Sequence, residues 1–204
     1  MALWAIVPVK PLRRGKSRLA GVLSEDERAL LNYSLLGNTL RTLSSVPEVA
    51  QILVVSSDPA ALSLAREFGA RTVQEEGHPD LSLAMHRAMT VAEMYQAEDV
   101  LILPADLPLL SRLEIQKILE LAVKPPVVVI APDRKSKGTN ALYMNPVGVI
   151  DYFHGDDSYH NHIQDAIKKG VRTEVCHLTS LGLDLDNPED LNILAQIEAL
   201  KSSS

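Results

Sequence analysis

Five cations follow the first apolar stretch of the chain, residues 4–9. They lie within nine residues and comprise Lys10, Arg13, Arg14, Lys16 and Arg18. Lysine and arginine side chains neutralise phosphate groups and hydrogen-bond to them. A solvated loop could have this composition, but a loop at the carboxyl end of a strand lies where α/β proteins bind their ligands. We therefore predict that this basic segment receives a polyphosphate.

An aspartate follows another apolar stretch, residues 100–103. Asp106 lies between Pro104 and Pro108. Carboxylate oxygens are preferred ligands of magnesium, and the flanking prolines restrict the backbone on both sides. The alternative is an aspartate in a rigid turn without a ligand.

A second acidic motif precedes a predicted helix. Asp184 and Asp186 are two residues apart, so in an extended segment both side chains point to the same side and could face one metal ion. Alternatively, Asp186 or Asn187 caps the helix that begins at Pro188. One aspartate on the metal and the other in a structural role is a third arrangement.

Other polar residues carry weaker signals. Residues 133–140 are basic, contain glycine and could bind a second anion through Thr139 and backbone N–H groups. His160 and His162 show no third ligand at a zinc spacing, which favours a polar helix surface. Cys176 lies in a predicted strand and is typical of a small core residue.

Two common nucleotide-binding motifs are missing from the sequence. Gly15, Lys16 and Ser17 match the end of a P-loop, but Lys10 stands where that pattern requires glycine. The sequence has no G-x-G-x-x-G. A Walker-type NTPase and a dinucleotide-binding Rossmann enzyme are therefore both disfavoured.

Short apolar stretches alternate with longer segments of helical spacing, which is typical of a mostly parallel sheet covered on both faces. Capping-box spacings at Ser24 and Glu27, and at Ser111 and Glu114, mark two helix starts. The predicted strands are residues 4–9, 51–56, 71–74, 100–103, 127–131, 140–144 and 173–177. The predicted helices are residues 24–43, 59–68, 80–95, 111–123, 159–169 and 188–200.

Length and composition predict one soluble domain. The 204 residues show no break in composition, so we expect a single domain over residues 1–201 and an irregular tail over 202–204. A net charge of -6 disfavours nucleic acid as a partner. No apolar stretch approaches the ~18 residues of a membrane span, and the cations follow the apolar start, the reverse of a secretory signal. One cysteine excludes an intramolecular disulfide framework and fits the cytoplasm.

Several of these motifs together resemble the CofC/FbiD family of guanylyltransferases. The resemblance is carried by residues 5–10, 16–19, 104–108, 138–142 and 184–191, in that order, and spans essentially the whole chain. It implies a single-domain, three-layer α/β/α fold of the nucleotide-diphospho-sugar transferase type. It also implies transfer of GMP from GTP to 2-phospho-L-lactate or phosphoenolpyruvate, with release of pyrophosphate, in coenzyme F-420 biosynthesis.

The resemblance also implies roles for individual residues. Mg²⁺ would be held by Asp106, Asp184 and Asp186, and the phospho-acid by Thr139, Gly155 and Ser158. The catalytic residues would be Lys10, Lys16 and Asp106. Contacts to GTP would come from Pro8, Lys10, Arg13, Lys16, Arg18, Ser82, Pro104 and Asp106. Ser82 stands where the family usually has asparagine. A homodimer is implied as well.

The proposed reaction needs cations more than it needs a base. A phosphate monoester with a second pKa near 6 is mostly ionised at pH 7, so no general base is required. Bringing this dianion to a triphosphate requires neutralisation by metal and lysine. The alternatives are a transferase of the same fold that uses molybdopterin or a sugar phosphate, and a non-catalytic nucleotide-binding module. Val9, Lys10, Pro11 and Leu12 replace the glycine-rich loop of the molybdenum enzymes, which disfavours that alternative.

Overall fold

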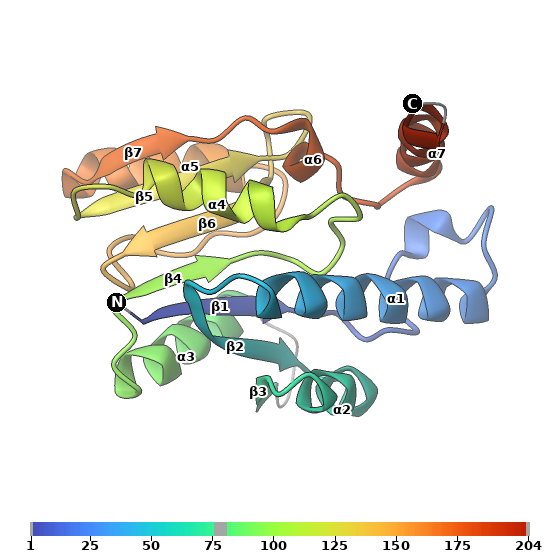
Figure 1. Ribbon diagram of the computed structural model, residues 1–204, viewed down its shortest axis with the longest axis horizontal. Coiled ribbons are helices and arrows are strands. Elements are labelled where there is room, and N and C mark those ends of the chain that lie inside the picture. The colour runs from blue at the N-terminus through green and yellow to red at the C-terminus, as the bar shows by residue number, and fades with distance from the viewer. Residues whose placement is uncertain (1, 76–80, 203–204) are drawn as a thin grey trace.

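The computed structural model describes residues 2–75 and 81–202, and within them seven strands form one sheet (Figure 1). The strand order is β3-β2-β1-β4-β6-β5-β7. The strands are β1 (Leu3–Pro8), β2 (Val49–Ser56), β3 (Arg71–Gln74), β4 (Asp99–Ile102), β5 (Val127–Pro132), β6 (Thr139–Asn145) and β7 (Arg172–Val175). All neighbouring pairs are parallel except those that β6 makes with β4 and β5.

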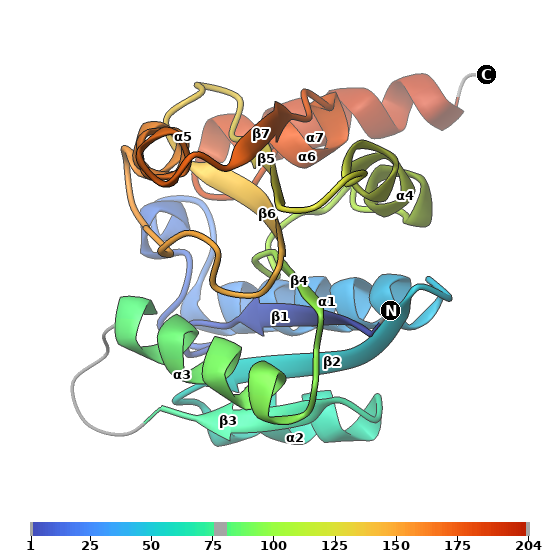
Figure 2. The same ribbon diagram turned by 90° about the vertical axis from the view of Figure 1, so that its left-hand side faces the viewer.

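Helices cover both faces of the sheet (Figure 2). The longer helices are α1 (Glu25–Ser44), α2 (Pro59–Glu67), α3 (Leu81–Met94), α4 (Arg112–Leu121), α5 (Ser158–Lys169) and α7 (Pro188–Ser202). Side chains alternate between the two faces of a strand. In β1, Ala5 and Val7 belong to the buried cluster that includes residues of α1, α2 and α4, whereas Trp4 and Ile6 belong to the cluster that includes residues of α3 and α5. Both faces of this strand are therefore core, which explains its unbroken apolar sequence.

The reversed direction of β6 determines what meets at one edge of the sheet. Strands β1, β4 and β5 all end at this edge, and β6, running the opposite way, begins there. Thr139 and Asn140, the first residues of β6, are thereby placed beside the loops that follow Pro8 and Ile102. Residues from four strands consequently share one site.

The predicted fold class, strands and longer helices are confirmed, and both predicted capping boxes are present. Two short helices were not predicted: η1 (Ser17–Leu19) and α6 (Thr179–Gly182), which have too few residues to show a 3.6-residue period. Helix α7 continues to Ser202, into the expected tail, and the expected start of α3 at Asp80 lies outside the described residues. No helix in the described part of the chain combines the length and apolarity that a bilayer crossing requires.

Candidate active site

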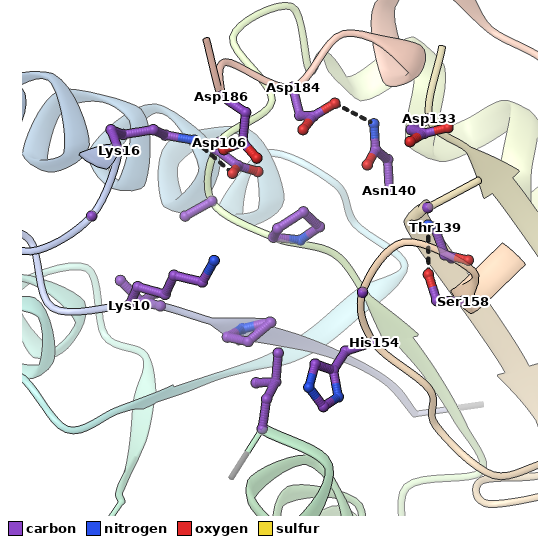
Figure 3. Close-up of a pocket in the computed structure, with 18 of the residues that line it drawn as sticks. Lys10, Lys16, Asp106, Asp133, Thr139, Asn140, His154, Ser158, Asp184 and Asp186 are labelled. Carbon is purple, nitrogen blue, oxygen red and sulfur yellow. Dashed lines mark hydrogen bonds and ion pairs between the residues drawn. The ribbon is translucent and has the colours of Figure 1, made fainter. Parts of the chain in front are cut away.

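A cavity of about 700 Å³ lies at this edge of the sheet. Its walls come from the loops after β1, β4 and β5, the start of β6, the segment before α5 and the segment after α6. Figure 3 shows Lys16 and three aspartates gathered on one side of it and Thr139 and Ser158 on another. The cavity therefore unites the basic segment, both acidic motifs and the residues expected to bind the phospho-acid.

The basic loop after β1 is held in place by two side chains from other elements. Asp58 accepts a hydrogen bond from the Leu12 N–H at 2.7 Å, while its other oxygen caps α2 at the Ala60 N–H. Asn32 of α1 donates to the Leu12 carbonyl, also at 2.7 Å. A Cβ at Gly15 would lie only 2.8 Å from the Asn32 Nδ2 atom, so a larger residue there would have to displace the Asn32 side chain.

Three carboxylates converge on one point. One oxygen each from Asp106, Asp184 and Asp186 lies within 4.8 Å of the others. The Leu185 N–H donates to the Asp106 carbonyl at 3.1 Å, which joins the two acidic segments through their backbones. The sequence prediction that Asp184 and Asp186 can face one metal ion together with Asp106 is thus supported by the geometry.

The cap of α7 leaves Asp186 available for this cluster. Asn187 is the N-cap residue, because its Oδ1 atom accepts hydrogen bonds from the backbone N–H groups of Glu189 and Asp190. The buried Asp190 carboxylate accepts in turn from the N–H groups of Asp186 and Asn187, at 3.0 and 2.9 Å. Its other oxygen meets Arg134 at 3.2 Å. The backbone around Asp186 is therefore fixed without using the Asp186 side chain.

Lys16 places its ammonium group among the carboxylates. Its Nζ atom lies 2.7 Å from Asp106 Oδ2 and 3.1 Å from Asp186 Oδ1. Burial alone would lower the pKa of Lys16, but the attraction of Asp106 and Asp186 outweighs it, and the pKa is raised. The residue reaches this position from a left-handed backbone conformation, with φ 58°, which costs a non-glycine residue about 1 kcal/mol.

The carboxylate cluster fits a hard divalent cation. Asp106 Oδ1 is buried and has no hydrogen-bond partner among the described residues, so it has an unused acceptor position. Burial, reinforced by Asp106 and Asp186, raises the pKa of Asp184 to about 6. Crowded carboxylates of this kind are relieved by a cation, and an all-oxygen donor set suits magnesium.

On the opposite side of the cavity, backbone and hydroxyl groups form a second polar subsite. The Thr139 N–H donates to Ser158 Oγ at 3.0 Å, which joins the start of β6 to the start of α5. Gly155 lies in the preceding loop with φ +89°, a backbone conformation that favours glycine. Thr139, Gly155 and Ser158 all line the cavity.

Most of the residues expected to contact GTP line the same cavity, namely Pro8, Lys10, Lys16, Arg18, Pro104 and Asp106. Two expected contacts do not line it. Arg13 is directed to the first turn of α1, where it pairs with Asp26 and Glu25, because these carboxylates attract it. Ser82 follows Leu81, which lines the cavity. Its Oγ atom lies 3.0 Å from Nδ1 of His154, which also lines the cavity, and the two form a hydrogen bond.

Several residues that shape the site were not identified from the sequence. Asn32, Asp58 and Asp190 act through backbone hydrogen bonds between distant segments, which no local spacing reveals. Asn140 carried a weak signal, and it donates to Asp184 at 3.4 Å. The expectation that His162 lies on a polar helix surface is wrong: its side chain is fully buried and both ring nitrogens are hydrogen-bonded.

Comparisons with known proteins agree with this geometry. The phosphoenolpyruvate guanylyltransferase of Rubrobacter xylanophilus is 40% identical over 199 residues, covering 98% of this chain and 95% of that protein. The 2-phospho-L-lactate guanylyltransferase of a Methanocaldococcus species is 33% identical over 187 residues, covering 91% and 78%.

Similarity of fold extends further than similarity of sequence. The 4-diphosphocytidyl-2C-methyl-D-erythritol synthase of Anaerococcus prevotii superposes with a TM-score of 0.68 at 13% identity, covering 97% of this chain and 96% of that one. The family model described as guanylyl transferase CofC like matches residues 3–199. This chain therefore belongs to the CofC-like guanylyl transferase family, and it is a nucleotidyl-transferring enzyme.

Proposed function

We propose that this enzyme transfers GMP from GTP to a phosphorylated three-carbon acid, phosphoenolpyruvate or 2-phospho-L-lactate, and releases pyrophosphate. The observation that carries the proposal is that the lysine-capped carboxylate cluster and the Thr139–Ser158 subsite lie in one cavity. The two halves of this cavity suit a nucleotide triphosphate and a small acid side by side. Relatives named for both acids support the two candidate substrates.

The reaction is a displacement at the α-phosphorus of GTP. A phosphate oxygen of the acid forms the new P–O bond, the bond to the bridging oxygen of the β-phosphate breaks, and pyrophosphate leaves with that electron pair. The attacking phosphate is already mostly ionised at pH 7. No side chain needs to remove a proton, so the protein contributes alignment and charge neutralisation.

Neutralisation is the larger task, because like charges 4 Å apart repel by ~4 kcal/mol at an effective dielectric of 20. Lys10, Lys16 and Arg18 line the cavity on the side of the basic loop and would bind the triphosphate. Lys16 exchanges carboxylate oxygens for phosphate oxygens when the nucleotide enters. Asp106, Asp184 and Asp186 would hold Mg²⁺, which supplies Lewis-acid stabilisation of charge on the phosphoryl oxygens.

The test is pyrophosphate release from purified enzyme with Mg²⁺, GTP and one acid at a time. We expect release with phosphoenolpyruvate or 2-phospho-L-lactate and much slower release with 3-phosphoglycerate. ATP and CTP in place of GTP measure the preference for guanine. Absence of pyrophosphate and of a guanylylated acid with every pair would refute the proposal.

A further inference from the structure

The buried imidazole of His162 connects three segments that form the subsite of Thr139, Gly155 and Ser158, called the acid subsite because the proposed acid substrate binds there. His162 lies four residues after Ser158 in α5, so both side chains are on the same face of the helix. Its Nδ1 atom is 3.0 Å from Thr139 Oγ1 at the start of β6. Its Nε2 atom is 3.0 Å from the backbone nitrogen of Phe153, in the loop that contains Gly155.

These two contacts determine where the imidazole proton lies. A backbone N–H can only donate, so Nε2 of His162 must be the unprotonated acceptor. The neutral ring then carries its proton on Nδ1 and donates it to Thr139 Oγ1. Burial lowers the pKa of His162 to about 4 against a weaker opposing effect of Asp165, which keeps the ring neutral at pH 7. Packing against the rings of Tyr152 and Phe153 holds its orientation.

The imidazole proton in turn sets the polarity of the subsite. Thr139 Oγ1 accepts from His162, and Ser158 Oγ accepts from the Thr139 N–H. In the described part of the chain, neither the Thr139 hydroxyl nor the Ser158 hydroxyl donates a hydrogen bond to another group of the protein. Both hydroxyl hydrogens remain for a ligand in the cavity that these residues line. Two adjacent donors match a group that only accepts hydrogen bonds.

We propose that His162 is a positioning residue that holds the Thr139 hydroxyl as a donor, so that the subsite binds an oxyanion. This inference rests on the proposed function, since it assigns the oxyanion to the carboxylate or phosphate of the acid substrate. His162 itself is fully buried and is not among the residues that line the cavity.

Two substitutions separate the two hydrogen bonds of the ring. Asparagine places an amide near Nδ1 and keeps a donor for Thr139, whereas glutamine reaches the position of Nε2 and keeps an acceptor for Phe153. We expect His162→Gln to raise the KM for the acid at least about tenfold, because a hydrogen bond to a charged ligand loses its orientation. The KM for GTP should stay within about twofold, and His162→Asn should raise the KM for the acid less than His162→Gln does.

A double-substitution cycle tests whether His162 acts through Thr139. Thr139→Val removes the hydroxyl, so His162→Gln should add little to its effect on the KM for the acid. Equal increases in the KM for GTP and for the acid, additive effects, or an unchanged KM in His162→Gln would overturn the proposal. If His162→Gln does not fold, the comparison of wild type with His162→Asn, in which the acid KM stays low, carries the kinetic test.

A readout that does not depend on turnover distinguishes this proposal from the proposed function. Long-range ¹H–¹⁵N spectra of enzyme labelled at histidine should show one ring with a proton on Nδ1 only, unchanged from pH 5.5 to pH 8 and absent from His162→Gln. A proton on Nε2, or an imidazolium in that range, would overturn the assignment. Loss of turnover with all acids in the wild type, beside this signature, would instead refute the proposed substrate.

Discussion

Replacing Lys16 by methionine tests whether its ammonium group stands in for a metal ion. The substitution keeps much of the apolar stem but removes the charge that pairs with Asp106 and Asp186 at 2.7 and 3.1 Å. The three carboxylates then face one another without a cation from Lys16. We expect the free energy of unfolding to fall in the absence of divalent metal and to be restored by Mg²⁺.

The size of the loss in the free energy of unfolding follows from the distances between the charged atoms and the exposure of the side chains. At an effective dielectric of 20 the two pairs attract by about 6 and about 5 kcal/mol before desolvation. The Lys16 side chain is 6% exposed, but those of Asp106 and Asp186 are 28% and 39% exposed. The net loss should lie between the ~0–1 kcal/mol of a surface pair and the ~3–5 kcal/mol of a broken buried pair. We take about 2 kcal/mol, which for a domain of this size lowers Tm by about 4–8 °C.

The assay is thermal unfolding in EDTA and then across a Mg²⁺ titration. Mg²⁺ should raise the Tm of Lys16→Met more than that of the wild type, because in the wild type the metal competes with the ammonium group. Lys10→Met is the matched control, since Lys10 is an exposed cation of the same cavity and should leave Tm in EDTA nearly unchanged. A Tm for Lys16→Met equal to that of the wild type in EDTA, with no larger response to Mg²⁺, would refute the reasoning.

Three further outcomes are expected. Asp106→Asn should slow pyrophosphate release at least about 100-fold and lower Tm less than Lys16→Met does, because it breaks one ion pair of Lys16 but also removes one like charge from the cluster; near-native turnover at low Mg²⁺ would contradict this. Gly15→Ala should displace Asn32 and raise the KM for GTP, an effect that Asn32→Ala should reproduce and that an unchanged KM would exclude. The pKa of His162 is about 4 in the folded protein and about 6.5 when unfolded. The unfolded chain therefore takes up the proton first, and stability that is complete above pH 6.5 declines toward pH 4. The advantage of the wild type over His162→Gln in urea unfolding should shrink by about 2–3 kcal/mol between pH 7.5 and pH 4.5; a constant difference would show that the ring does not titrate in this way.

The fold could be predicted because its signals are local. Buried strands such as residues 100–103 are continuously apolar, and Ser24 and Ser111 each start a capping box that the structure contains. The acidic motifs were found from local signals too: Asp106 follows a buried strand, whose end lies at the ligand-binding edge of such a sheet, and Asp184 and Asp186 are two residues apart. The antiparallel direction of β6 could not be predicted in this way, because the sequence of a short apolar strand does not indicate whether it pairs in parallel or antiparallel orientation.

The supporting residues of the site could not be predicted, because their partners are distant in the sequence. His162 meets Thr139 across 23 positions, and Asp190 meets Arg134 across 56. Composition misled for His162, since the polar run His160, Asn161 and His162 favours a surface position. Arg13, which was predicted to contact GTP, pairs in the structure with the carboxylates of Glu25 and Asp26, and its place in the basic loop does not reveal these partners.

Helix α7 contributes to the stability of the fold and, through Asp190, to the position of Asp186. A truncation series would separate these two contributions. The first turn of α7 contains Asp190, whose carboxylate accepts hydrogen bonds from the Asp186 N–H and from the Arg134 guanidinium group. Among the described residues, those beyond Asp190 contribute no carboxylate to the cluster. Trimming the helix from its C-terminal end should thus lower Tm in small steps while catalysis persists, until the cut removes Asp190 and the backbone of Asp186 loses the hydrogen bond that fixes it.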